Sequence, residues 1–118
     1  MFAVENLRDW VGKNVIDPEG KTIGELEAIY VDVDNDQPAF ATVTVGMIGR
    51  RRLVFVPLSG ATVKPDAVRV RYDKKLVRDA PSIDTDGELL ATDEPAIFAH
   101  YELNYPANST HERQLARR

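Results

Sequence analysis

Short runs of hydrophobic residues, many of them alternating with polar residues, cover most of the first part of the chain. Alternation with a period of two places successive side chains on opposite faces of a β-strand. Residues that favour tight turns, mainly Pro, Gly, Asn and Asp, separate these runs. The pattern predicts strands at residues 14–17, 22–34, 39–45, 51–58, 62–64 and 67–72.

The longest predicted strand, 22–34, changes its alternation partway along. Leu26 and Ala28 alternate with Glu25 and Glu27 at even positions, whereas Val31 and Val33 alternate with Asp32 and Asp34 at odd positions. Because a shift of one residue moves the following side chains to the opposite face of a sheet, both sets can face one core only across an irregularity. We therefore expect a β-bulge or a sharp bend near Ile29–Tyr30.

Helical periodicity is confined to short segments. Residues 5–11 and 74–79 can each form a turn or two of helix, and we expect Trp10 to fill one end of the core, with a partner anchor as the alternative. Residues 82–90 show neither strand nor helical periodicity, and we expect them to be irregular. A short C-terminal helix is predicted by an apolar stripe at helical spacing, which comprises Ile97, Phe98, Tyr101 and Tyr105.

Several short strands with tight turns, followed by one helix, predict a mainly β protein. The expected architecture is a small, strongly bent antiparallel β-barrel with a short C-terminal helix. The length of 118 residues fits a single domain, which we assign to residues 1–105. The polar composition of residues 106–118 predicts a disordered tail.

The charge of the chain argues against general binding to polyanions. The net charge is -4 and the isoelectric point is about 5.1, so nucleic acid is an unlikely partner. No apolar stretch approaches the ~20 residues that span a bilayer, and we expect no direct membrane insertion. The chain has no cysteine, which fits a cytoplasmic location.

The loop between the predicted strands at 39–45 and 51–58 combines apolar and basic residues. Gly46-Met47-Ile48-Gly49 is expected to close a hairpin, and three arginines follow it directly: Arg50, Arg51 and Arg52. We expect Arg51 and Arg52 to face the acidic residues of strand 22–34, Glu25 and Glu27, at about two strand spacings, ~10 Å. The alternative is that the arginines contact an acidic partner.

Other groups of polar residues match no reaction centre. An EF-hand loop that began at Asp32 would need Gly and Glu where this chain has Gln37 and Val43, so that motif fails and we predict no metal site. The two histidines, His100 and His111, lack further ligands, and we expect His100 to pack or form a hydrogen bond beside the helix. No nucleophile with a base and an oxyanion site can be recognised. We therefore predict no enzymatic activity and no cofactor.

The order and spacing of four segments resemble the PRC-barrel family, which is named for the H subunit of photosynthetic reaction centres. The segments are VGKNVIDPEGKTIGELEAIYVDVD, FATVTVG, RRLVFVPLSGATV and VRVRYDKKLVRDAP, and the first contains the core Val-x-Asp-x-x-Gly-x-x-Ile-Gly at Val15–Gly24. The later DEPAIFAHYELNY, with its pair His100-Tyr101, resembles the closing segment of free-standing bacterial members. The resemblance covers roughly residues 10–105.

The resemblance implies a compact barrel that acts as a docking module. Relatives include the cytoplasmic domain of the reaction-centre H subunit and the C-terminal part of a ribosome maturation factor, but we expect neither the former's membrane helix nor the latter's additional domain in this protein. We expect a non-enzymatic protein–protein interaction module of unknown partner, with a homodimer left open. Two alternatives are RNA or ribosome-assembly binding through Arg50–Arg52, and a barrel that binds a small ligand or metal. The first partner-binding candidates are Met47, Ile48, the three arginines and, as a further exposed apolar residue, Phe40.

Overall fold

The computed structural model of the protein describes residues 4–106 and 113–118, and the side chains from residue 7 onward within them. Along the chain, the elements are η1 (Val4–Trp10), β1 (Asn14–Ile16), β2 (Thr22–Asp32), β3 (Pro38–Val45), β4 (Arg52–Pro57), β5 (Thr62–Val63), β6 (Ala67–Arg69), α1 (Lys74–Arg78), β7 (Ser82–Asp84), η2 (Ala91–Asp93), α2 (Glu94–His100) and β8 (Leu115–Arg117). No helix among these residues is long and apolar enough to cross a lipid bilayer.

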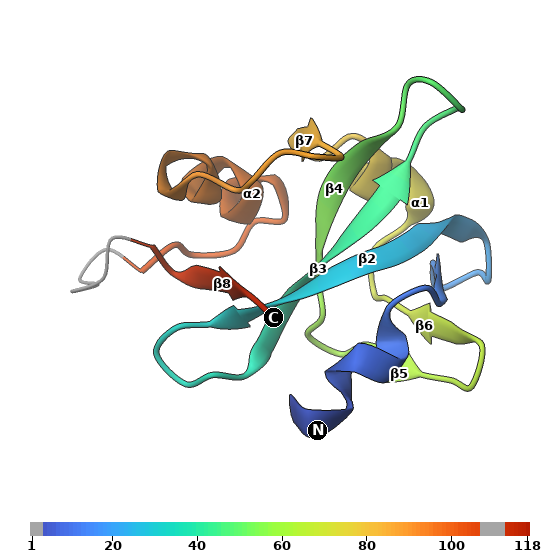
Figure 1. The fold of residues 1–118 in the computed structure, drawn as a ribbon, viewed down its shortest axis with the longest axis horizontal. Coiled ribbons are helices and arrows are strands. Elements are labelled where there is room, and N and C mark those ends of the chain that lie inside the picture. The colour runs from blue at the N-terminus through green and yellow to red at the C-terminus, as the bar shows by residue number, and fades with distance from the viewer. Residues whose placement is uncertain (1–3, 107–112) are drawn as a thin grey trace.

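All eight strands belong to one strongly bent sheet (Figure 1). Seven of them follow the order β5-β6-β1-β2-β3-β4-β7, and β8 pairs with β2 outside this path. The pairings are antiparallel except for that of β1 with β6. The predicted fold class is confirmed: the protein is mainly β with a short C-terminal helix, although the sheet path is open between β5 and β7.

Strand β2 is the longest element and contains two irregularities. Its register against β3 shifts between Leu26 and Ala28, and again between Tyr30 and Val31. The second shift falls beside the bulge that the alternation predicts, and the first was not expected. Between these two irregularities, four consecutive residues, Ala28 through Val31, all have buried side chains.

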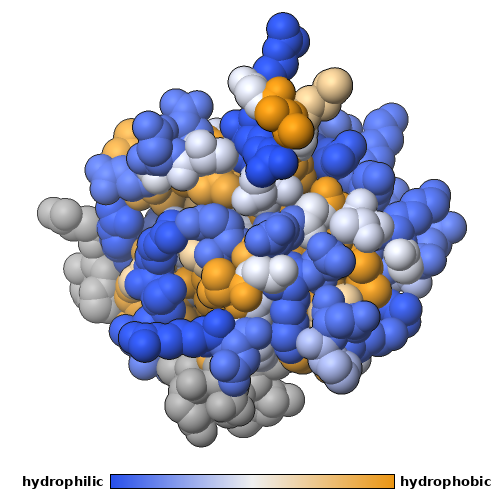
Figure 2. All heavy atoms as spheres, turned by 45° about the vertical axis from the view of Figure 1, so that its right-hand side comes forward, coloured by the Kyte–Doolittle hydropathy of each residue, from blue (hydrophilic) through white to orange (hydrophobic). Residues whose placement is uncertain are grey.

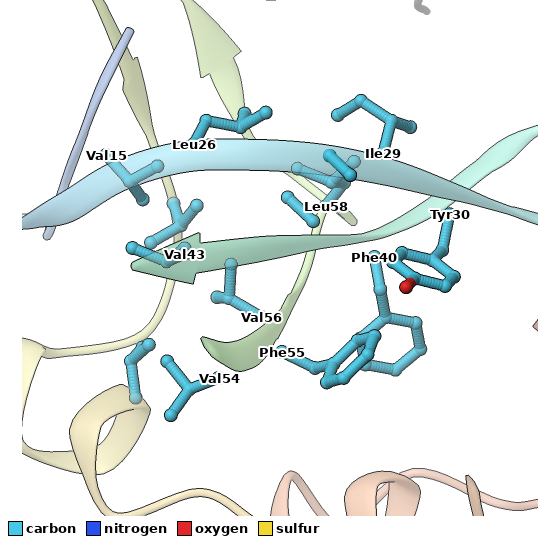
Figure 3. Packing of buried hydrophobic residues seen from close by; sticks show 14 of the residues in the cluster. Val15, Leu26, Ile29, Tyr30, Phe40, Val43, Val54, Phe55, Val56 and Leu58 are labelled. Atoms are coloured by element: carbon cyan, nitrogen blue, oxygen red, sulfur yellow. The ribbon is translucent and has the colours of Figure 1, made fainter. Parts of the chain in front are cut away.

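The core is filled mainly by β2, β3 and β4 (Figure 3), and runs of consecutive buried residues at 28–31 and 53–57 place core side chains on both faces of the strands. Tyr30 and Phe55 meet edge to face, with ring centroids 5.0 Å apart. Phe40 is buried, with its ring 5.1 Å from that of Phe98 on α2, so the suggestion that Phe40 is exposed is wrong. Trp10 is also buried, as expected of a core residue.

The predicted apolar stripe attaches α2 to this core. Ile97, Phe98 and Tyr101 are buried, and the Tyr101 hydroxyl donates a hydrogen bond of 2.5 Å to the carbonyl oxygen of Phe55. Burial raises the pKa of Tyr101 well above its usual value. The helix therefore serves as core, as its sequence pattern indicates.

The prediction of a disordered tail at 106–118 needs correction where the structure describes that stretch. Leu115–Arg117 form β8, an ordered strand that pairs antiparallel with Tyr30–Asp32 of β2. Residues 107–112 lie outside the described residues. The composition of the tail is polar, but Gln114, Arg117 and Arg118 find partners on the sheet, which local composition cannot reveal.

Candidate partner-binding surfaces

The β3–β4 hairpin ends in an exposed apolar tip. The hairpin is formed as predicted: β3 ends at Val45, β4 begins at Arg52, and the Arg50 N–H donates a 2.8 Å hydrogen bond to the Met47 carbonyl. The side chains at the tip stand in solvent, with Met47 79% and Ile48 89% exposed. Figure 2 shows this apolar patch on a projection of the molecule, next to strongly hydrophilic atoms. We call Met47 and Ile48 the hairpin tip.

The geometry of the hairpin tip depends on a glycine. Gly46 has a φ of +100°, and a Cβ atom there would lie 2.5 Å from the carbonyl oxygen of Arg50. L-residues with side chains rarely adopt this backbone conformation, and the close carbonyl excludes the extra carbon. The sequence thus fixes a tight loop that directs Met47 and Ile48 outward.

The three arginines do not form one cluster. Arg52 is half-buried and donates a 2.8 Å hydrogen bond to the carbonyl oxygen of Arg78, which joins β4 to the end of α1. Arg51 is exposed and shares the lining of a hollow of about 310 Å³ with Glu25. Arg50 is exposed beside the hairpin tip. Arg50 and Arg51 are therefore the more exposed members of the triplet, and Arg52 is held by its bond to α1.

The expected relation between the arginines and Glu27 is wrong. Glu27 instead accepts two hydrogen bonds from the guanidinium of Arg117 on β8, at 2.5 and 3.3 Å. The hydrogen bond and the negative charge of Glu27 raise the pKa of Arg117, against the opposing effect of burial. Glu27 is thus paired with the C-terminal strand, whereas Glu25 shares a hollow with Arg51.

The acidic run at 32–36 also contacts this C-terminal strand. The Gln114 side-chain amide donates 2.8 Å hydrogen bonds to the carboxylates of both Asp32 and Asp34. Asp36 forms an ion pair with Arg118. Within residues 4–106 and 113–118, no group of three or more acidic, His or Cys side chains is placed to hold a metal ion.

A buried carboxylate on α2 was not anticipated by the sequence. The side chain of Glu94 is fully buried and accepts hydrogen bonds from the Tyr105 hydroxyl (2.6 Å), the Gln114 N–H (2.7 Å) and the Leu115 N–H (3.1 Å). A buried charge is tolerated where hydrogen bonds replace its lost hydration. Glu94 therefore joins α2 to β8.

A second buried carboxylate, Asp17, organises the turn between β1 and β2. It accepts hydrogen bonds from the backbone N–H groups of Glu19 (3.0 Å), Lys21 (2.9 Å) and Lys74 (3.2 Å). Although burial disfavours its charged form, the bonds from Lys21, Lys74 and Glu19 hold the pKa of Asp17 below its usual value.

Asp17 borders the larger hollow described, of about 370 Å³, which has both basic and acidic side chains around it. Its lining includes Lys74, Lys75 and Arg78 on one hand and Glu19, Asp73 and Asp79 on the other. This mixture of charges selects no ligand of either sign.

His100 has a structural role at the end of α2, as expected. Its Nε2 lies 2.7 Å from the Leu76 carbonyl oxygen and donates to it, and its ring meets that of Tyr101 edge to face. His111 lies outside the described residues.

A single, strongly bent and mostly antiparallel sheet is typical of a small β-barrel module. The chain matches the family model of the PRC-barrel domain over residues 3–77, and it therefore belongs to this family. No curated protein matches the chain at a significant level. The match ends within α1, so α2, Glu94 and β8 lie beyond it, and the likeness of DEPAIFAHYELNY to a family closing segment stays a prediction.

Proposed function

We propose that the protein is a non-enzymatic PRC-barrel module that binds another protein through the hairpin tip. The observation that supports this most directly is the exposure of two adjacent large apolar side chains, Met47 and Ile48, on a projecting hairpin. Elsewhere, the apolar residues of the sheet are mostly buried in a well-filled core. Exposed apolar groups of this kind, with charged neighbours, are typical of contact sites.

The chemistry around the tip favours a partner with an apolar recess and an acidic rim. Arg50 and Arg51 flank the tip and can pair with carboxylates at the edge of such a contact. Arg52 is half-buried and donates to the Arg78 carbonyl, so its guanidinium keeps its charge but is held beside α1. The net charge of -4 and the apolar tip favour a protein over RNA, because RNA binding draws on a positively charged surface.

The proposal includes a cytoplasmic location, supported by the lack of cysteine, and it leaves room for self-association. A homodimer would arise if the partner surface lies on a second copy of the chain. Sedimentation at increasing concentration distinguishes this form from a hetero-complex.

The double variant Met47→Ser/Ile48→Ser tests the proposal. Proteins that bind the tip are expected to co-purify with the wild type and to be lost with this variant. Val11→Ser and Leu90→Ser serve as matched controls, because each replaces an apolar residue that is 51% exposed outside the hairpin. Unchanged partners and unchanged self-association in the double variant would contradict the proposal. RNA binding that weakens steeply with salt and disappears in Arg50→Ala/Arg51→Ala would support the RNA alternative instead.

A further inference from the structure

Strand β8 occupies an edge of β2 that the rest of the sheet leaves open. β1 pairs with β2 only over Thr22–Glu25, and β3 covers the opposite edge. β8 fills the remaining stretch, with Val33 N–H bonded to the Gln114 carbonyl and Arg118 N–H bonded to the Ile29 carbonyl, at 2.9 and 2.8 Å. Figure 1 shows β8 beside β2. Without β8, this edge would present unpaired backbone groups.

Two side chains of the segment 113–118 are held in buried positions. Leu115 is completely buried in the hydrophobic core, and the Gln114 amide nitrogen bridges Asp32 and Asp34. The backbone N–H groups of Gln114 and Leu115 both donate hydrogen bonds to the Glu94 carboxylate. One buried carboxylate therefore binds the main chain of β8 while β2 binds its other side.

The surroundings of β8 are strongly acidic, and the strand is basic. Five carboxylates contact the segment 113–118: Glu27, Asp32, Asp34, Asp36 and Glu94. Two of its arginines form ion pairs with them, Arg117 with Glu27 and Arg118 with Asp36. Because these arginines are about half-exposed, their pairs contribute at most ~1 kcal/mol each, and burial of Leu115 together with the backbone pairing supplies most of the attraction.

We propose that the β2 edge from Ile29 to Val33, together with Glu94, is a binding site for an extended basic peptide, and that β8 is its intramolecular occupant. The pattern that the site recognises is Gln-Leu-x-Arg-Arg, as in residues 114–118. The ligand in question is a segment of a partner protein that adds to β2 as a strand, as in other cases of β-strand addition. β8 covers the site until such a segment replaces it. This site is separate from the hairpin tip and does not depend on the function proposed for it.

The test uses the full chain with Leu115→Glu, which places a charge where the core accepts only an apolar group and so empties the site. The probe is a fluorescently labelled peptide with the sequence of residues 113–118. We expect saturable binding to the variant, at least about tenfold tighter than to the wild type, in which the resident strand competes at a local concentration on the order of millimolar. Binding should weaken with salt, and a peptide with Glu in place of Leu should not bind.

The control is Ile48→Glu, the same change of side-chain type at an exposed position of the hairpin tip. It should bind the peptide as the wild type does, so that failure of this proposal and failure of the proposed function are told apart. A Leu115→Glu chain that unfolds cooperatively yet binds the peptide no more tightly than the wild type would overturn the proposal. If Leu115→Glu does not fold, the double variant Arg117→Glu/Arg118→Glu is used in its place. This variant weakens the attachment of β8 to β2 through substitutions at exposed positions. Peptide affinity equal to that of the wild type in this double variant would also overturn the proposal.

Discussion

The Tyr105 hydroxyl donates a 2.6 Å hydrogen bond to the buried carboxylate of Glu94, eleven residues earlier in the chain. The same carboxylate oxygen accepts the Gln114 N–H, and the other oxygen accepts the Leu115 N–H. Three separate parts of the chain, namely α2, the segment after it and β8, therefore meet at one side chain. This contact orders the C-terminal part of the fold against the sheet.

Replacement of Glu94 by Gln should destabilise the protein strongly. The amide keeps one acceptor oxygen, but its NH2 group would face donors where the second carboxylate oxygen now accepts a hydrogen bond. We expect the free energy of unfolding to fall by about 3 kcal/mol, because buried donors lose their partner. Chemical denaturation measures this change. Glu102→Gln, an exposed residue just after the helix, is the matched control and should leave stability within about 0.5 kcal/mol of the wild type.

Tyr105→Phe removes one donor from the Glu94 carboxylate and should cost about 1 kcal/mol at neutral pH. Burial, the hydrogen bond to Glu94 and the negative charge of Glu94 raise the pKa of Tyr105 to about 12. A raised folded-state pKa stabilises the protonated native form, so this contribution is complete below the unfolded value of 10.0 and is lost as pH rises toward 12. The stability difference between wild type and Tyr105→Phe should therefore shrink between pH 9 and 12. A difference that stays constant over that range would contradict this assignment.

The hairpin tip offers a matched pair of glycine substitutions. Both glycines have a positive φ, which strains any residue with a Cβ atom. In Gly46→Ala the new Cβ also meets the Arg50 carbonyl, whereas in Gly49→Ala it lies in open space. We expect Gly46→Ala to lower the free energy of unfolding by about 2–3 kcal/mol and Gly49→Ala by about 1 kcal/mol. Thermal or denaturant unfolding of the two variants compares them directly. Equal losses would show that the close carbonyl has no effect beyond backbone strain.

Much of the fold follows from local pattern in the sequence. Short apolar runs between turn residues predict β2, β3 and β4, and the switch of alternation near Val31 predicts an irregularity in β2. The apolar stripe predicts α2. These features depend on residues that are neighbours in sequence, and this is the range over which periodicity is informative.

The missed features depend on pairing between distant segments. β7 has only three residues, Ser82–Asp84, and is a strand because β4 offers it an edge. β8 lies in a polar and basic segment, and this segment is held by carboxylates 20 or more residues away in the sequence. Glu94 appeared as an ordinary acidic residue in the first turn of a helix, because nothing near it in the sequence shows that residues 105, 114 and 115 return to it. The best available signal was the excess of acids in 17–36, which calls for basic residues elsewhere in the fold.

Asp17 predicts a specific dependence of stability on acid. Its carboxylate holds the turn between β1 and β2 and the start of α1 through three backbone N–H groups, and Asn at this position keeps only one acceptor oxygen. We expect Asp17→Asn to lower the free energy of unfolding by about 2 kcal/mol at neutral pH. The folded-state pKa of Asp17 lies below the ordinary value of 3.8. The charged carboxylate therefore stabilises the fold fully above pH 3.8, and this stabilisation is lost as the pH falls through the lower folded pKa. The difference in unfolding free energy between the wild type and Asp17→Asn should therefore narrow as the pH falls below about 4, which denaturant unfolding at several pH values measures. The exposed Asp66→Asn serves as the control and should follow the wild-type curve. A gap that stays the same or widens in acid would show that the charge of Asp17 does not hold this turn.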